Sequence, residues 1–245
     1  MGVSLFPVAD RLDLIEAAEA MGSALWPIWL GTHAQRTYWS SLYGPELAAF
    51  QTIAVDDASG AVVGLANSVP FQRPETLPDT GWDWVLEHGV LAARAASPVN
   101  ALSALSVDIL PDQRGTGLAT RLLEAMKTPA RHSGLISMVA PVRPTQKALY
   151  PLQDFATYCG WRRDDGSPFD PWLRTHEALG ATTIGPAMAS MTVTAPLEKW
   201  RGWTGLRFPA DGRYAIPGAL APLVVHLATD SGTYAEPNLW MEHPL

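Results

Sequence analysis

A glycine-rich turn between an apolar run and a helical pattern is the strongest constraint on how this chain of 245 residues folds. The run 101–110 predicts a buried strand. Arg114-Gly-Thr-Gly117 forms the turn, and the residues after it place Leu118, Leu122 and Met126 on one helical face. Glycines let a ligand approach the backbone closely, and the first N–H groups of a helix have no internal partner. The segment therefore predicts a site for a phosphate-bearing ligand.

Composition and charge narrow the class of protein. Hydrophobic residues make up 47% of the chain and charged residues 17%, which is enough apolar material for a sizeable core. The formal net charge of −7 argues against nonspecific binding to nucleic acid. Cys159 is the single cysteine, so an intrachain disulfide is excluded and a reducing cytoplasm fits. No run of 18 apolar residues and no leader peptide is visible, so we expect a cytoplasmic protein without membrane spans.

Strand and helix patterns alternate along the chain, with no long polar linker between them. The expected strands are 51–56, 61–69, 101–110, 135–142, 190–194, 220–227 and 234–240. The expected helices are 10–21, 32–50, 81–96, 145–150, 171–180 and 197–204. Asp170 before Pro171 is a strong helix start, and 152–169 looks irregular. This order predicts a mixed α/β sheet in a single domain over 1–245.

The pattern Arg114-x-x-Gly117-x-Ala119 resembles the acyl-CoA signature of the GCN5-related N-acetyltransferase (GNAT) superfamily, Gln/Arg-x-x-Gly-x-Gly/Ala. The strand before it and the strand 135–142 after its helix are placed as in that family. The resemblance covers roughly 53–142. It implies a GNAT-like acyl-CoA transferase fold, with an insertion at about 151–170 and an elaborated C-terminal third at about 186–245.

The resemblance also implies acetyl-CoA or another acyl-CoA as co-substrate. Backbone N–H groups of the turn would bind the diphosphate, which the partial positive charge of a helix start favours. Backbone groups of the preceding strand would pair with the pantetheine arm and the acyl carbonyl. The residues expected at the co-substrate are Val107, Ile109, Arg114, Gly115, Thr116, Gly117, Leu118 and Ala119. The histidines show no metal-ligand spacing, so we predict no metal.

The resemblance leaves two candidates for the general acid. Family members carry a tyrosine, in a Leu-Tyr-x-x-x-Gly-Phe segment, that can protonate the departing CoA thiolate. Tyr150 matches the tyrosine but is followed by Pro151, whereas His176 takes the tyrosine's place before the glycine of a second partial match. For the general base we take Glu87. Asp83, His88 and Asp108 are alternatives.

These observations predict an N-acyltransferase that transfers an acetyl group directly to the amine of a small molecule. One alternative keeps the fold but takes the acyl group from an aminoacyl-tRNA or a carrier protein. Five basic residues support that donor, although the net charge argues against tRNA: Arg143, Lys147, Arg162, Arg163 and Arg174. A second alternative is a noncatalytic acyl-CoA-binding module. The sequence leaves a homodimer open.

Overall fold

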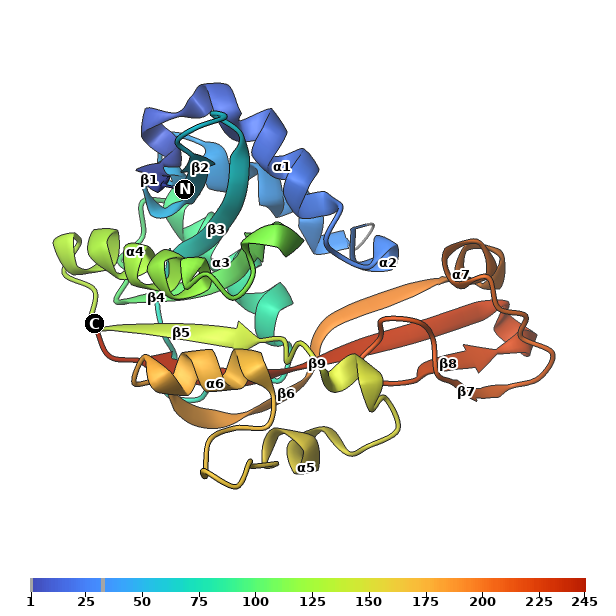
Figure 1. Cartoon of the computed structure of the whole chain (residues 1–245). Helices are drawn as coiled ribbons and strands as arrows, with labels where there is room; N and C mark the ends of the chain where they lie inside the picture. Colours follow the sequence, from blue (N-terminus) through green and yellow to red (C-terminus); the bar gives the residue numbers. More distant parts are fainter. Residues whose placement is uncertain (1, 32–33) are drawn as a thin grey trace.

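The computed structural model describes residues 2–31 and 34–245, which are built on one mixed sheet (Figure 1). The strands are β1 (Val3–Pro7), β2 (Thr52–Asp56), β3 (Val62–Phe71), β4 (Ala101–Ile109), β5 (Ser137–Val142), β6 (Thr182–Pro196), β7 (Gly212–Tyr214), β8 (Leu223–His226) and β9 (Ser231–His243). Their order is β1-β2-β3-β4-β5-β9-β8-β7, and β6 also pairs with β9. β4 and β5 run parallel, and the other recorded pairs are antiparallel. The mixed α/β fold expected from the sequence is confirmed.

Helices cover both faces of this sheet. They are α1 (Ile15–Ser23), α2 (Ile28–Gly31), α3 (Gly81–Arg94), α4 (Leu118–His132), α5 (Phe155–Cys159), α6 (Pro171–Ala178) and α7 (Leu197–Thr204). Along β5, Met138 and Ala140 pack with α4 and α6, whereas Val139 packs with α3. Successive strand residues point to opposite faces, so α4 and α6 lie on one face and α3 on the other. Among the described residues, no helix combines the length and apolar character needed to cross a membrane.

The structure differs from the expected elements mainly near the N-terminus. The expected helix 10–21 begins at Ile15, after the 3-10 turns η1 (Val8–Asp10) and η2 (Leu12–Leu14). The expected helix 32–50 is instead η3 (Ala34–Tyr43) and η4 (Ala48–Phe50); its residues 32 and 33 lie outside the described residues. Gly44-Pro45 separates the two turns, and proline lacks the N–H that a continuous helix needs.

Other differences follow from tertiary contacts that local patterns do not report. The expected helix 145–150 is one 3-10 turn, η6 (Lys147–Leu149), and α5 lies inside the segment expected to be irregular. β1 and β7 were not expected; both are short and are formed by pairing with β2 and β8. The prediction of 197–204 as a helix is confirmed by α7.

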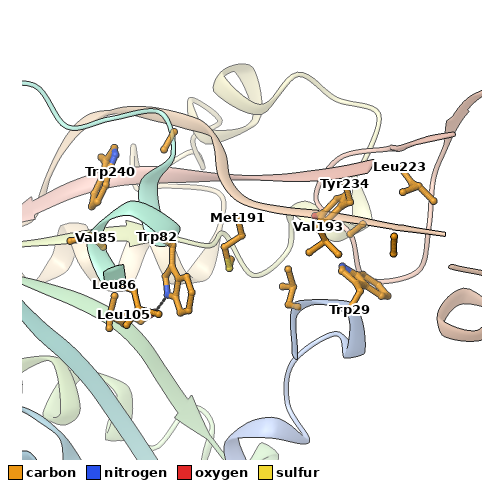
Figure 2. Close-up of a cluster of buried hydrophobic side chains, with 14 of the residues drawn as sticks. Trp29, Trp82, Val85, Leu86, Leu105, Met191, Val193, Leu223, Tyr234 and Trp240 are labelled. Atoms are coloured by element: carbon orange, nitrogen blue, oxygen red, sulfur yellow. Dashed lines mark hydrogen bonds between the residues drawn. The ribbon is translucent and has the colours of Figure 1, made fainter. Parts of the chain in front are cut away.

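The C-terminal third extends away from the rest of the sheet. We call residues 191–236 the arm; it contains the outer parts of β6 and β9 together with β7, β8 and α7 (Figure 1). Trp29 of α2 packs against two aromatic residues of the arm, with ring centroids 6.1 Å from Trp200 and 6.2 Å from Tyr234. Figure 2 shows Trp29 and Tyr234 in a row of buried side chains that continues to Trp82. The arm and α3 therefore share one apolar core.

Asp170 connects α6 to the chain that leaves β5. As expected from the sequence, it caps α6: its carboxylate accepts from the N–H groups of Trp172 and Leu173. It also accepts from the N–H groups of Thr145 and Gln146 and from the hydroxyl of Tyr158. The residue is 1% exposed, so these bonds replace the water that a buried carboxylate has lost.

We predict that Asp170→Ala lowers the free energy of unfolding by about 2–4 kcal/mol. The substitution removes a helix cap and leaves several buried hydrogen-bond donors without an acceptor. Urea unfolding followed by circular dichroism measures this. The control is Asp165→Ala in an exposed turn, where a loss of about 0.5–1 kcal/mol is expected. Equal losses in the two variants would contradict this role for Asp170.

Candidate active site

β4 and β5 pair over three residues and then separate. Ala101 to Ser103 lie opposite Ser137 to Val139, but β4 continues to Ile109 and β5 to Val142. The edge of β4 beyond this point therefore presents backbone N–H and C=O groups that have no partner on β5. A cavity of about 490 Å³ opens where the strands separate. Such an edge can pair with an extended ligand that carries amide groups.

Four of the eight residues predicted to contact the co-substrate line this cavity: Val107, Ile109, Arg114 and Ala119. The other four, Gly115, Thr116, Gly117 and Leu118, form the turn between Arg114 and Ala119. β4 thus supplies one wall and the start of α4 another. The opposite wall comes from the end of β5 and from α6.

The turn before α4 offers free backbone donors. Gly115 and Gly117 have φ angles of +76° and +85°, a left-handed conformation that glycine adopts without strain. The hydrogen bonds recorded for the described residues include no acceptor for the amides from Gly115 to Thr120. Amides that converge at a helix start favour an anion, so the turn is suited to a diphosphate.

A β-bulge in β4 marks the inner end of the cavity. Ser68 lies opposite Ala104 and Asn67 opposite Ser106, which leaves Leu105 as the extra residue. The indole of Trp82 on α3 donates to the Leu105 carbonyl at 3.0 Å, the bond drawn in Figure 2. Trp82 therefore holds the bulge from the face opposite α4.

A chain of polar side chains crosses the core beside this bulge. The Asn67 amide donates to the Ser106 hydroxyl at 3.1 Å, which donates to one oxygen of Asp108 at 3.0 Å. The indole N–H of Trp26 donates to the other Asp108 oxygen at 2.7 Å. Asp108 is 5% exposed, and these two bonds hold its carboxylate in a fixed position.

A second, smaller chamber of about 40 Å³ adjoins the cavity. The two spaces share five lining residues: Trp26, Trp82, Ser106, Asp108 and Met191. The small chamber is otherwise lined by residues of α1, α2, β3 and η3, including Glu19, Trp39 and Tyr43. Trp39 stacks on Trp82, with ring centroids 5.8 Å apart. The described lining is thus aromatic, and its charged members, Glu19 and Asp108, are both acidic.

His176 of α6 lies on the wall of the large cavity. Its Nδ1 is 2.7 Å from Nε2 of His243, and both rings are buried. Burial, together with the neighbouring imidazole, lowers the pKa of His176 to about 3, and burial lowers that of His243 to about 4. Both imidazoles are therefore neutral at pH 7. A neutral imidazole N–H is a poor proton donor, which argues against His176 as the general acid and leaves it as a hydrogen-bonding group of the wall.

Tyr150 and Glu87 lie outside the described lining of both spaces. Tyr150 packs with Tyr158, Trp161 and Phe169, at ring-centroid distances of 5.8, 5.1 and 6.0 Å. The Glu87 carboxylate accepts from the hydroxyl of Tyr38. Their catalytic roles stay predictions. Of the residues considered for the base, Asp108 is the one that the structure places on both spaces.

The five basic residues around the insertion do not form one surface. All five have partners within the described chain: Arg143 pairs with Glu236, Arg162 with Glu177 and Arg163 with Asp165, and the Lys147 ammonium donates to the carbonyls of Tyr150 and Leu220. Arg174 donates to the Pro168 carbonyl. Burial raises the pKa of the nearby Cys159 thiol to about 12, so this thiol is a poor nucleophile.

Sequence reasoning missed the residues that come from distant segments. Trp26, Trp172, Met191 and Asn238 line the large cavity, yet no motif connects them. The one available signal was the number of tryptophans, ten in this chain, several of which form the walls.

Comparisons with known proteins agree with this geometry. No protein-family model matches the chain. A curated relative, the arginine N-acetyltransferase avaD of Aspergillus versicolor, is 32% identical over 274 aligned residues, which cover 100% of this chain and 94% of the relative. Together with the separated strands and the turn, this relative decides the family. The chain belongs to the GNAT superfamily.

Solved structures share the fold of this acetyltransferase. The loading GNATL domain of CurA from Lyngbya majuscula is 19% identical with a TM-score of 0.63, covering 100% of this chain and 98% of that domain. The GphF GNAT-like decarboxylase in complex with isobutyryl-CoA is 17% identical with a TM-score of 0.53. That match covers 100% of this chain and 99% of the decarboxylase chain. The prediction of a GNAT-type acyltransferase is confirmed.

We predict that the histidine pair makes stability depend on pH. Unfolded histidines bind protons near pH 6.5, whereas the folded pair binds them only near pH 3–4. The unfolded state therefore binds more protons below pH 6.5, and stability is lost as the pH falls from there toward the folded pKa values. Between pH 7 and pH 5 the free energy of unfolding should fall by at most about 2 kcal/mol per histidine.

Urea unfolding at a series of pH values measures this slope. The double variant His176→Gln/His243→Gln should flatten it, whereas His132→Gln, at an exposed position, should leave it unchanged. A slope that persists in the double variant would assign the effect to other groups.

Proposed function

We propose that this acetyltransferase transfers an acetyl group from acetyl-CoA to a nitrogen of a small cationic molecule. One observation carries the proposal: the cavity at the separated strands adjoins an acidic, aromatic chamber, and Asp108 lines both. The first space suits acyl-CoA, because it offers a free strand edge and the amides of a helix start. The second suits an acceptor amine, since carboxylates and aromatic faces both attract cations.

The relative supports the same class of acceptor, because its name assigns it arginine. A noncatalytic module has less support, since a binding site for acyl-CoA alone would not need a second chamber at the acyl end. A cytoplasmic setting is part of the proposal and is supported by the single cysteine of the sequence, which excludes an intrachain disulfide.

The reaction we propose is direct transfer. A protonated nitrogen of the acceptor's cationic end first gives up one proton, and the freed nitrogen bonds to the acyl carbonyl carbon as the carbon–sulfur bond breaks. The nitrogen loses a second proton as the amide forms, and that proton balances the charge of the thiolate. We assign receipt of the first proton to Asp108, because its carboxylate lines both spaces. We assign stabilisation of the negative charge on the carbonyl oxygen to the N–H groups along the edge of β4.

Release of free thiol from acetyl-CoA in the presence of L-arginine tests this function. We expect steady turnover, with acetylated product identified by mass spectrometry. Binding of acetyl-CoA without turnover of arginine or any other amine would support the noncatalytic alternative instead. Absence of acetyl-CoA binding in calorimetry would favour a tRNA or carrier-protein donor.

We predict that Gly117→Ala weakens acyl-CoA binding at least about tenfold, because a Cβ at this φ distorts the turn whose amides would bind the diphosphate. Calorimetry gives the dissociation constant. Gly134→Ala is the matched control: Gly134 follows the other end of α4, has a φ of +69° and, like Gly117, has no neighbour within 4 Å of an added Cβ.

Both variants should lose similar stability, but Gly134→Ala should bind acyl-CoA like the wild type. Equal dissociation constants for acyl-CoA in the two variants would show that the turn does not contribute to the co-substrate site.

A further inference from the structure

We propose that the acceptor is recognised at two ends, on either side of Trp26: Asp108 and Glu19 bind a cationic end, and Arg143 binds a carboxylate or carbonyl oxygen. The substrate class is then an amino acid, or an amide of one, with a cationic side chain. This inference rests on the proposed function and specifies how its acceptor is selected.

The cationic end is assigned from the small chamber. Its described charged residues are both acidic, and Trp26, Trp39 and Trp82 supply ring faces. A planar guanidinium stacks on such faces and donates to carboxylates at its edge, which a neutral side chain of the same shape cannot do. Asp108 is held by Trp26 and Ser106, so its carboxylate needs little reorganisation to accept this charge.

The oxygen-binding end is assigned from Arg143, which lines the large cavity just beyond β5. Its Nε donates to Glu236 at 2.6 Å, and its Nη2 donates to Glu236 at 3.2 Å and to the Gly218 carbonyl at 2.8 Å. The hydrogen bonds recorded for the described residues include none from Nη1. The arm therefore fixes the guanidinium through one edge, and Nη1 remains to donate to a ligand.

Glu236 also decides what Arg143 can bind. Burial lowers the pKa of Arg143, but the Glu236 carboxylate more than offsets this, so the guanidinium stays charged. Because Glu236 balances that charge, the pair is neutral and acts mainly as a hydrogen-bond donor. It should accept a carbonyl oxygen nearly as well as a carboxylate.

Trp26 joins the two ends. The Arg143 guanidinium carbon lies 5.9 Å from the centre of the Trp26 ring, and the Trp26 N–H lies 2.7 Å from Asp108. One indole thus separates a hydrogen-bond donor, Arg143, from a carboxylate, Asp108. A molecule that reaches across this ring can satisfy both ends and keep a nitrogen near the end of β4, where both spaces meet.

The test is calorimetry of the wild-type protein saturated with CoA, using four probes. L-arginine and L-arginine amide carry both features, L-citrulline lacks the side-chain cation, and agmatine lacks the carbonyl group. We expect arginine and its amide to bind within about threefold of each other. Citrulline and agmatine should each bind at least about tenfold more weakly, since each loses a charge-assisted hydrogen bond.

Two variants assign these losses to residues. Asp108→Asn should raise the dissociation constant of arginine at least about tenfold but change that of citrulline less than about threefold. Arg143→Met combined with Glu236→Gln avoids an unpaired buried charge and should abolish the advantage of arginine over agmatine. The matched control, Arg162→Met combined with Glu177→Gln, removes an exposed ion pair away from both spaces. It should change neither the binding of arginine nor its advantage over agmatine.

The outcomes separate this inference from the proposed function. Thiol release with arginine, but equal binding of all four probes or no response to Asp108→Asn, would overturn the two-ended site alone. Failure of arginine to bind at a concentration of about 10 mM would also overturn it. Absence of turnover with any amine would instead overturn the proposed function. A far-ultraviolet circular dichroism spectrum and a urea unfolding midpoint like those of the wild type show that each variant is folded.

Discussion

A parallel strand pair that ends after three residues leaves a row of backbone hydrogen-bonding groups inside the protein without a strand partner. Such groups are costly when they are buried and unpaired, so the separation of β4 from β5 needs something to hold it open. β5 is held by β9 on its other side, and β4 is held by β3. Trp82 holds the bulge in β4 from the face opposite α4. The cavity, the turn before α4 and the chamber beside Asp108 all take their places from this separation.

The strand, the turn and the helix on the proposed donor side could be predicted from the sequence because they are local. A strand, a turn with two left-handed glycines and an amphipathic helix follow one another within some 30 residues, and each has its own signal. The cap at Asp170 was equally readable, since Asp before Pro is a local pattern.

The acceptor side could not be predicted in the same way, because it is assembled from segments far apart in the chain. Asp108 and Trp26 are 82 residues apart, and Arg143 and Glu236 are 93 residues apart. Whether His176 is an acid also depends on distance: its low pKa comes from burial and from His243, 67 residues away. Burial and long-range contacts cannot be inferred from the local spacing of residues. The surroundings of each side chain are therefore known only from the fold.

The attachment of Arg143 to the arm gives the C-terminal third an influence beyond packing. The residues that orient this guanidinium, Glu236 and Gly218, lie outside the segment that resembles the family signature. Under the proposed two-ended recognition, substitutions in the arm change which molecule is modified while the proposed donor site stays as it is. In evolutionary terms the fold separates two heritable traits, a short continuous stretch for the common donor and a dispersed, independently variable set for the acceptor.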